Sequence, residues 1–297
     1  TPVLLYWWGV FTYSINIGLY DDSTLFSMLS TLDEAEGLQE KAAILFGQSS
    51  GHRNVTVKIV AWLLVLLTGE IDFKLASILG SLSLAFLLIL FYRVFPVTQY
   101  KVLYFIPVIP FVLSLNNWGL VIRPIYPLSN YYTLVYAGFA LWFLCKPGNL
   151  FFVFALLLSF MATFNMAAGM LIFVPGQLYL IAQRDIKRGL VWFLFGTACT
   201  LYYLDGINFG GFASFMVEGS MTPLNYIGFY LTFLGSSLSR GRTIVAIPTG
   251  LVGVIWFIYL TRKQYYFNNP VVYFLMLFVL IVGLAVAYGR TEFGVGA

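Results

Sequence analysis

Two adjacent aspartates, Asp21 and Asp22, follow a strongly apolar run and could carry acid–base chemistry. A carboxylate is costly next to the hydrocarbon of a bilayer unless it has a function or reaches water. One such group can act as a general base that removes a proton from a hydroxyl, and like-charge repulsion within the pair makes one member a stronger base. The simpler interpretation is that both residues cap the following helix and mark the water boundary. The two residues alone are compatible with either interpretation.

Basic residues at three places could bind a phosphate group. His52-Arg53 follows the aspartates on the same segment, Arg240 and Arg242 lie in "SSLSRGRTI", and Arg290 lies in "AYGRTEFG". Arginine suits phosphate because its planar fork binds two oxygens at once and stays charged. The alternatives are a surface histidine without a role and, for Arg240, Arg242 and Arg290, ordinary cytoplasmic anchors.

An aromatic stretch, "NNWGLVIRPIYPLSNYY", could provide a surface on which a sugar stacks. Its candidate residues for binding an acceptor are Trp118, Arg123 and Tyr126. The alternative is an interfacial belt, because tryptophan and tyrosine are common at membrane boundaries. Cys145 and Cys199 lie in apolar runs, which predicts free thiols rather than a disulfide or metal site.

The composition determines the setting of these residues. Of 297 residues, 60% are hydrophobic, 19% aromatic and 9% charged, and the mean hydropathy is +0.88. Such a chain is an integral membrane protein, and its long apolar runs do not alternate as the strands of a β-barrel do. We therefore predict an all-α, polytopic transmembrane bundle of about 9 to 11 membrane helices, forming a single domain over residues 1–297. The net charge of +4 is explained by basic cytoplasmic loops, so no nucleic acid is expected as a partner.

The apolar runs predict where the helices lie. The expected ranges are 3–20, 55–68, 75–92, 101–115, 130–145, 149–164, 167–182, 189–204, 224–237, 243–261 and 270–289. The first run is long enough to act as an uncleaved first span. Because the chain starts at Thr1 without a methionine and stops at Ala297, we also expect trimming at both ends.

The loop charges predict that residues 21–74 form an outer loop. The basic turns after residues 92, 145 and 183 all face the cytoplasm only if the short run 55–68 does not cross, so this run is expected to be a surface or re-entrant helix. The outer loop then holds eight of the twelve acidic residues. Past residue 205 the charges on the two sides are balanced and leave the topology open.

Two amphipathic helices are expected within this outer loop. The first follows the aspartates, because Leu25, Met28, Leu29 and Leu32 share one face at helical spacing. The stretch 31–34, Thr-Leu-Asp-Glu, has the pattern of a capping box, which predicts that a second helix begins there and ends near residue 47. Both helices would lie on the membrane surface.

The order of these features resembles the N-terminal module of the GT-C superfamily of polytopic glycosyltransferases. Members have an acidic pair just after the first helix, a long outer loop with juxtamembrane helices, and a short helix followed by an apolar span that ends in arginine. Here these features are Asp21-Asp22, the helices up to Phe46, the run from His52 to Gly69, and Leu75 to Arg93. The chain resembles uncharacterised bacterial members in which a His-Arg dipeptide opens the short helix.

The resemblance implies a function. It implies an inverting transferase at the outer face of a bacterial inner membrane, with a polyprenyl-phosphate sugar as donor and a glycan, lipid or protein of the cell envelope as acceptor. Asp21 would be the base, Asp22 its supporting neighbour, Arg53 the first phosphate ligand and His52 a second. No nucleotide is expected, and the need for a divalent metal is left open. The chain departs from the pattern in two respects: Ser-Ser-Gly precedes His52 where an acidic residue is expected, and the proline-rich turn of many members is absent.

Three other functions are compatible with the composition. A flippase or secondary transporter for lipid-linked sugars would carry ionisable residues at mid-membrane, and the expected spans are nearly free of Asp and Glu. A polysaccharide polymerase or ligase would need a large, arginine-rich outer loop late in the chain. A non-catalytic subunit of a larger complex is the third. Walker, dinucleotide-binding and nucleophile-elbow motifs are absent from the sequence.

Overall fold

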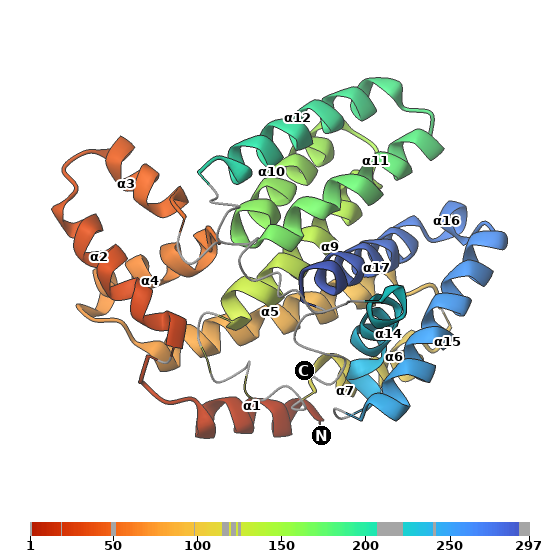
Figure 1. The fold of residues 1–297 in the computed structure, drawn as a ribbon, viewed down its shortest axis with the longest axis horizontal. Coiled ribbons are helices and arrows are strands. Elements are labelled where there is room, and N and C mark those ends of the chain that lie inside the picture. The colour runs from red at the N-terminus through yellow and green to blue at the C-terminus, as the bar shows by residue number, and fades with distance from the viewer. Residues whose placement is uncertain are drawn as a thin grey trace. The chain divides into compact units, whose positions relative to one another are not determined.

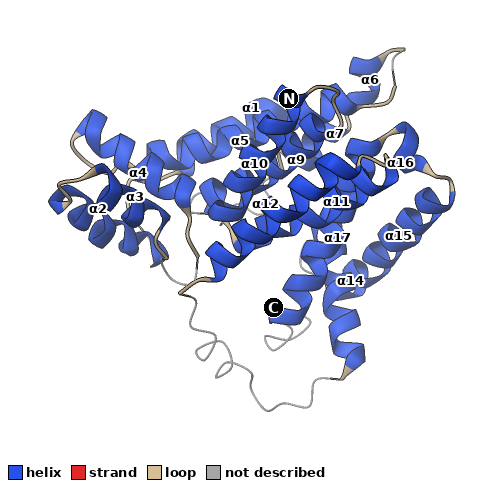
Figure 2. Ribbon diagram, turned by 90° about the horizontal axis from the view of Figure 1, so that it is seen from above, coloured by secondary structure: helices blue, strands red, loops and turns tan. Residues whose placement is uncertain are grey.

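The computed structural model of the protein is helical, and the residues that it describes contain no strand (Figures 1 and 2). The described residues are 2–18, 20–48, 52–97, 99–114, 119, 123, 126–206, 222–239 and 242–290, with the backbone alone at 20, 21 and 290. Three helices are long and apolar enough to cross a membrane: α5 (Phe73–Val94), α15 (Thr243–Arg262) and α17 (Pro270–Arg290). The prediction of an all-α membrane protein is confirmed. The number of crossings stays a prediction, because the other apolar helices are shorter.

Two compact units make up the chain. The first comprises Thr1–Phe173 and Leu190–Asp205, and the second comprises Val174–Gly189 and Gly206–Ala297. Besides α5, the first unit contains α1 (Pro2–Tyr13), α2 (Thr24–Glu34), α3 (Leu38–Phe46), α4 (Val55–Thr68), α6 (Lys101–Phe105), α7 (Val108–Val112), α9 (Tyr132–Leu144), α10 (Asn149–Asn165) and most of α12 (Ile186–Leu204). The second contains most of α11 (Phe173–Ala182), then α14 (Pro223–Ser239), α15, α16 (Tyr265–Asn268) and α17.

The helices of the predicted outer loop pack together beside one end of α5 (Figure 1). The apolar face predicted for α2 is confirmed, because Leu25, Met28 and Leu32 are buried there. They share a core with side chains of the three neighbouring helices: Leu45 of α3, Val57, Ala61 and Leu64 of α4, and Phe73 and Ala76 of α5. Burial of this apolar face positions the turn that precedes α2.

The first helix is shorter than the sequence predicted. It was expected to reach residue 20 but ends at Tyr13, after 12 residues. A long-range hydrogen bond holds the following residues outside the helix: the side-chain oxygen of Asn16 accepts from the backbone N–H of Phe73, 2.7 Å away, in the first turn of α5. Asn16 thereby satisfies a donor that α5 cannot satisfy itself, and the chain leaves the helix to reach it.

The predicted capping box at residues 31–34 is wrong. The hydroxyl of Thr31 donates to the carbonyl of Ser27, 3.0 Å away and one turn earlier, so Thr31 lies inside α2. The second helix instead begins after Gly37 and ends before Gly47, close to the predicted end. The apolar face of α2 extends past Thr31 to Leu32, and its burial outweighs the capping signal.

Two other apolar runs are broken where the sequence predicted continuous helices. The run 101–115 divides into α6 and α7 around Pro107, which has no backbone N–H and whose ring clashes with the preceding turn. After α10 the chain is extended at Met166 and then forms the 3₁₀ helix η4 (Ala167–Ile172), so the predicted helix 167–182 is α-helical only from Phe173. At Gly169 a Cβ atom would lie 1.9 Å from the carbonyl oxygen of Ala162, so only glycine fits.

In the second unit, α14 and α15 approach each other through glycine. A Cβ atom on Gly235 would lie 2.0 Å from the carbonyl oxygen of Ala246, and one on Gly250 would lie 2.0 Å from that of Leu231. Small residues allow such backbone contact between membrane helices, where van der Waals packing drives association.

The close approach of α14 and α15 leads to a prediction that can be tested with a control on the same helix. Gly250→Ala is expected to lower the free energy of unfolding by about 1–3 kcal/mol, because the added methyl group overpacks the contact. Gly253→Ala, three residues later on the same helix, meets nothing within 4 Å and should be neutral or stabilising by up to about 1 kcal/mol, because alanine favours helix. Thermal unfolding of the purified protein in detergent measures both. Equal effects of the two substitutions would contradict the packing described for α14 and α15.

Candidate functional site

The aspartate pair lies in a short 3₁₀ helix, η1 (Tyr20–Ser23), directly before α2. Asp22 is 1% exposed and takes part in at least one polar or electrostatic interaction. The side chain of Asp21 lies outside the described residues. A buried carboxylate is tolerated only when other groups compensate its charge, so Asp22 suits a supporting role better than direct contact with a substrate.

The segment that leads into this turn is fixed to the N-terminus of α5. Besides the bond from Phe73 to Asn16, a side-chain oxygen of Asp72 accepts from the backbone N–H of Leu75, 2.8 Å away, and caps the helix. Gly18 lies against the ring of Phe73, where a Cβ atom would come within 2.8 Å of the ring. The turn is therefore attached to one end of a helix long enough to span the membrane.

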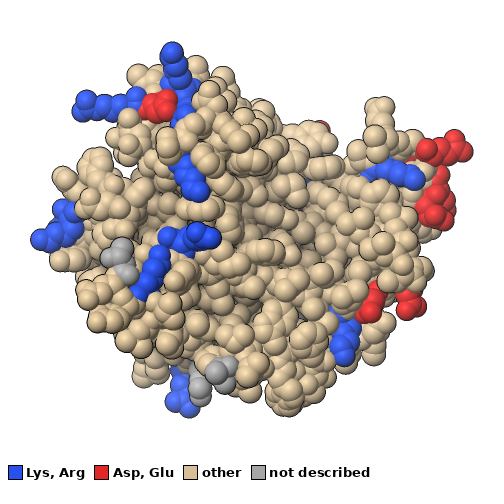
Figure 3. All heavy atoms as spheres, turned by 180° about the vertical axis from the view of Figure 1, so that it is seen from behind, with Lys and Arg blue, Asp and Glu red and all other residues tan. Residues whose placement is uncertain are grey.

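Acidic side chains gather around this part of the first unit. Asp33 and Glu34 end α2, Glu36 lies in the turn that follows, and Glu40 lies in the first turn of α3; all four are exposed. Figure 3 shows the red atoms of acidic residues concentrated over this region. This charge is compatible with a segment that faces water.

Arg53 is buried and its guanidinium binds backbone carbonyl groups. Nη1 donates to the carbonyl of Phe46 at 2.6 Å, and Nη2 donates to those of Tyr202 at 2.7 Å and Asp205 at 2.9 Å. Nε and Nη2 both donate to the carbonyl of Tyr203 at 3.3 and 3.2 Å. The guanidinium carbon also lies 4.9 Å from the centre of the Tyr202 ring, a cation–π contact.

These contacts give Arg53 a structural role. It satisfies carbonyl groups that the last turns of α3 and α12 leave free, and its positive charge is favourable at the negative end of both helix dipoles. Asn54 adopts the left-handed conformation, which asparagine tolerates, and turns the chain from Arg53 into α4. The prediction that Arg53 binds a phosphate is not supported by this geometry, because most of its donors are used by carbonyl oxygens.

Lys58 is a second buried cation that the sequence did not single out as functional. Its Nζ donates to the carbonyls of Gly47 at 2.6 Å and Ile44 at 3.3 Å, so it caps the end of α3 together with Arg53. Burial, followed by the charge of Arg53, lowers the pKa of Lys58 to about 8. A lysine in the otherwise apolar stretch Val55–Thr68 was the available signal.

His52, next to Arg53, is half-buried and engaged with neighbouring groups. It precedes α4 as the aspartate turn precedes α2, and these two helices share one apolar core. The aspartate turn, however, is attached to the N-terminus of α5, which follows the other end of α4. The two predicted site segments therefore adjoin opposite ends of α4, a helix of 14 residues and about 21 Å.

Asn165 joins several elements and was also missed by sequence reasoning. It is fully buried at the end of α10, and its Nδ2 donates to the carbonyls of Leu128 and Ser129 and to the hydroxyl of Thr133. Its Oδ1 accepts from the backbone N–H of Thr56 in the first turn of α4. One side chain thus ties α4 and α10 to the chain that enters α9. Its signal was an asparagine in a strongly apolar run, which is costly unless bonded.

The predicted aromatic surface is described in part. The guanidinium of Arg123 lies 5.7 Å from the centre of the Tyr126 ring, so the structure brings these two residues together. Both are half-buried and precede η3 (Pro127–Tyr131), a π-helix of the kind that often marks functional sites. Trp118 lies outside the described residues.

The remaining basic candidates belong to the second unit. Arg242 is exposed at the start of α15, and Arg290 ends α17, with its side chain outside the description. Arg240 lies outside the described residues. The described residues contain no group of three or more acidic, histidine or cysteine side chains that could hold a metal ion.

Comparison with protein-family models, with curated proteins and with solved structures finds no match.

Proposed function

We propose that the protein is a GT-C-like glycosyltransferase of the bacterial inner membrane, which moves a sugar from a polyprenyl-phosphate donor to an acceptor of the cell envelope at the outer face. The observation that carries the proposal is the order of elements in the first 94 residues. A first helix is followed by the aspartate turn, two short amphipathic helices, a short apolar helix and a membrane-spanning helix. This is the order that the resemblance to the superfamily requires.

The chemistry assigned to the turn is general base catalysis. Asp21 takes the proton from an acceptor hydroxyl while that oxygen bonds to the anomeric carbon of the sugar, and the bond from this carbon to the phosphate oxygen breaks. The polyprenyl phosphate leaves with the electron pair of that bond, and the anomeric configuration is inverted. Asp22, which is buried, supports Asp21. Within the same unit, His52 is the candidate phosphate ligand, because the donors of Arg53 are largely used by backbone carbonyl groups.

The membrane-spanning helices favour a transferase over a transporter. Helices α5, α15 and α17 carry no acidic residue. Coupling of transport to protons or ions needs ionisable groups at mid-membrane, whereas acid–base chemistry at the water boundary does not. The acidic residues of the first unit instead lie at helix ends and turns, as the proposal requires.

Release of the lipid carrier tests the function. The purified protein is reconstituted in liposomes that contain polyprenyl phosphates carrying hexoses or pentoses, together with a bacterial envelope lipid extract as acceptor. A transferase converts one donor to free polyprenyl phosphate, which mass spectrometry detects. A flippase would change only the side on which the donor is exposed, and a non-catalytic subunit would do neither. Release of carrier from none of the donors would count against the proposal.

A further inference from the structure

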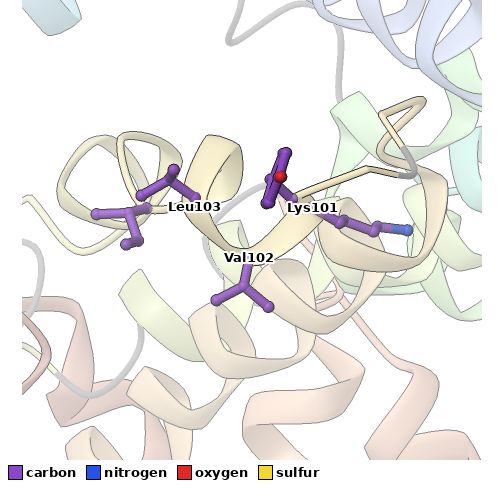
Figure 4. Close-up of a pocket in the computed structure, with 5 residues that line it drawn as sticks. Lys101, Val102 and Leu103 are labelled. Carbon is purple, nitrogen blue, oxygen red and sulfur yellow. The ribbon is translucent and has the colours of Figure 1, made fainter.

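A shallow, open groove lies on the surface of α6, beyond the C-terminal end of α5. It has a volume of about 510 Å³ and is lined by Tyr100, Lys101, Val102, Leu103 and Ile106 (Figure 4). Its lining is apolar except for the ammonium group of Lys101 and the hydroxyl of Tyr100. The apolar side chains are largely exposed, with Val102 at 65% and Leu103 at 63%. Such a surface is stable only against lipid or another apolar partner.

The groove lies far from the aspartate turn. That turn is attached to the N-terminus of α5 through Asn16 and Phe73, whereas the groove follows the C-terminus of the same helix. A helix of 22 residues is about 33 Å long, which matches the thickness of the hydrocarbon core of a bilayer. With α5 crossing the bilayer, as its length and composition allow, the groove lies at the opposite membrane boundary from the turn.

The charge beside the groove is positive and has no acidic counterpart nearby in the sequence. Arg93 is exposed in the last turn of α5, and the Nζ of Lys101 lies 4.8 Å from the centre of the Tyr92 ring. Between Asp72 and Asp185 the sequence contains no acidic residue. Among the described residues, no ion pair involves Arg93 or Lys101.

We infer that this groove binds an anionic glycerophospholipid. An acyl chain lies along Val102, Leu103 and Ile106, and the headgroup phosphate meets Lys101, with Arg93 adding to the local positive potential. An anionic lipid fits better than a zwitterionic one because the acids that could neutralise these cations are absent from this stretch. The inference does not depend on the proposed glycosyltransferase activity.

Native mass spectrometry of the purified protein in detergent tests the inference. The protein is titrated with phosphatidylglycerol or with phosphatidylcholine, and retained lipid is counted. We expect phosphatidylglycerol to be preferred and Lys101→Gln to weaken its binding about fivefold, the effect of one basic residue at a lipid surface. Lys263→Gln is the matched control, because Lys263 also follows a membrane-spanning helix and lies 5.9 Å from the ring centre of Tyr259, but does not line the groove.

A second variant separates the groove from charge alone. Leu103→Gln keeps every charge and should reduce retention of phosphatidylglycerol, because it removes apolar contact with the acyl chain. Unfolding temperatures of the variants verify that each is folded. Three results would each overturn the inference. The unaltered protein could retain the two lipids equally, Lys101→Gln and Lys263→Gln could have equal effects, or polyprenyl phosphate could preferentially displace phosphatidylglycerol.

Discussion

Asp21→Asn is expected to lower the rate of sugar transfer by about 10²- to 10⁴-fold, the usual contribution of a general base. Asparagine has nearly the same shape as aspartate but cannot take the proton from the hydroxyl group of the acceptor substrate. The turn itself should survive, because Asn16 and the buried residues of α2 attach it to the first unit. Release of polyprenyl phosphate by the reconstituted protein measures the rate.

The matched control for this substitution is Asp33→Asn. Asp33 is an exposed acid on the same segment, near the end of α2, so its replacement removes the same charge away from the turn. It should change the rate less than twofold, since surface charges beyond about a Debye length, ~8–10 Å, are largely screened. Full activity of Asp21→Asn, or an equal loss with Asp33→Asn, would contradict the assignment of Asp21 as base.

Arg53→Lys is expected to destabilise the first unit by about 1–3 kcal/mol for each carbonyl left unsatisfied, although the charge is kept. The ammonium group of lysine cannot reproduce the fork that reaches four carbonyl groups from one position. The four carbonyl groups would then compete for fewer donors; they belong to Phe46, Tyr202, Tyr203 and Asp205. Each buried carbonyl left without a hydrogen bond costs about 1–3 kcal/mol.

Hydrogen exchange measures this effect where it should occur. In Arg53→Lys, amides of α3 and of the last turn of α12 should exchange faster, because Arg53 holds both ends. Arg262→Lys, an exposed arginine at the end of α15, is the control and should leave exchange in α3 unchanged. A wild-type exchange pattern in Arg53→Lys would show that the carbonyl contacts contribute little.

Much of the fold followed from hydrophobic patterning. The bounds of α4 were predicted as Val55–Thr68 and are confirmed, because Asn54 and Gly69 interrupt the apolar run on either side. The prediction for α5 was short by only a few residues, since its cap, Asp72, is separated from the apolar stretch by Phe73 and Lys74. Local composition determines where these helices begin and end.

Two of the errors arose from bonds between residues that are distant in the sequence. The end of the first helix depends on a bond between Asn16 and Phe73, which are 57 residues apart in the chain. The contacts of Arg53 with Tyr202 span 149 residues. Nothing in the spacing of residues near Arg53 distinguishes a phosphate ligand from a helix cap, so only tertiary structure could correct that expectation.

Candidate site residues were predictable to a lesser degree than helices. The sequence predicted that Asp21, Asp22, His52 and Arg53 lie on one segment, and the structure places the two turns that contain them beside opposite ends of α4. The sequence analysis missed Asn165 and Lys58, because their roles depend on carbonyl groups of other elements. Polar residues inside apolar runs were the signal for both.

The central claim is that the aspartate turn works on the extracytoplasmic side of the membrane, and thiol labelling in intact cells tests it most directly. In a background in which serine replaces Cys145 and Cys199, the variants Asp33→Cys and Lys187→Cys are treated with a membrane-impermeant maleimide. We predict that Asp33→Cys reacts in intact cells, whereas Lys187→Cys reacts only after the membrane is opened. Labelling of Lys187→Cys in intact cells, with Asp33→Cys protected until lysis, would contradict the claim.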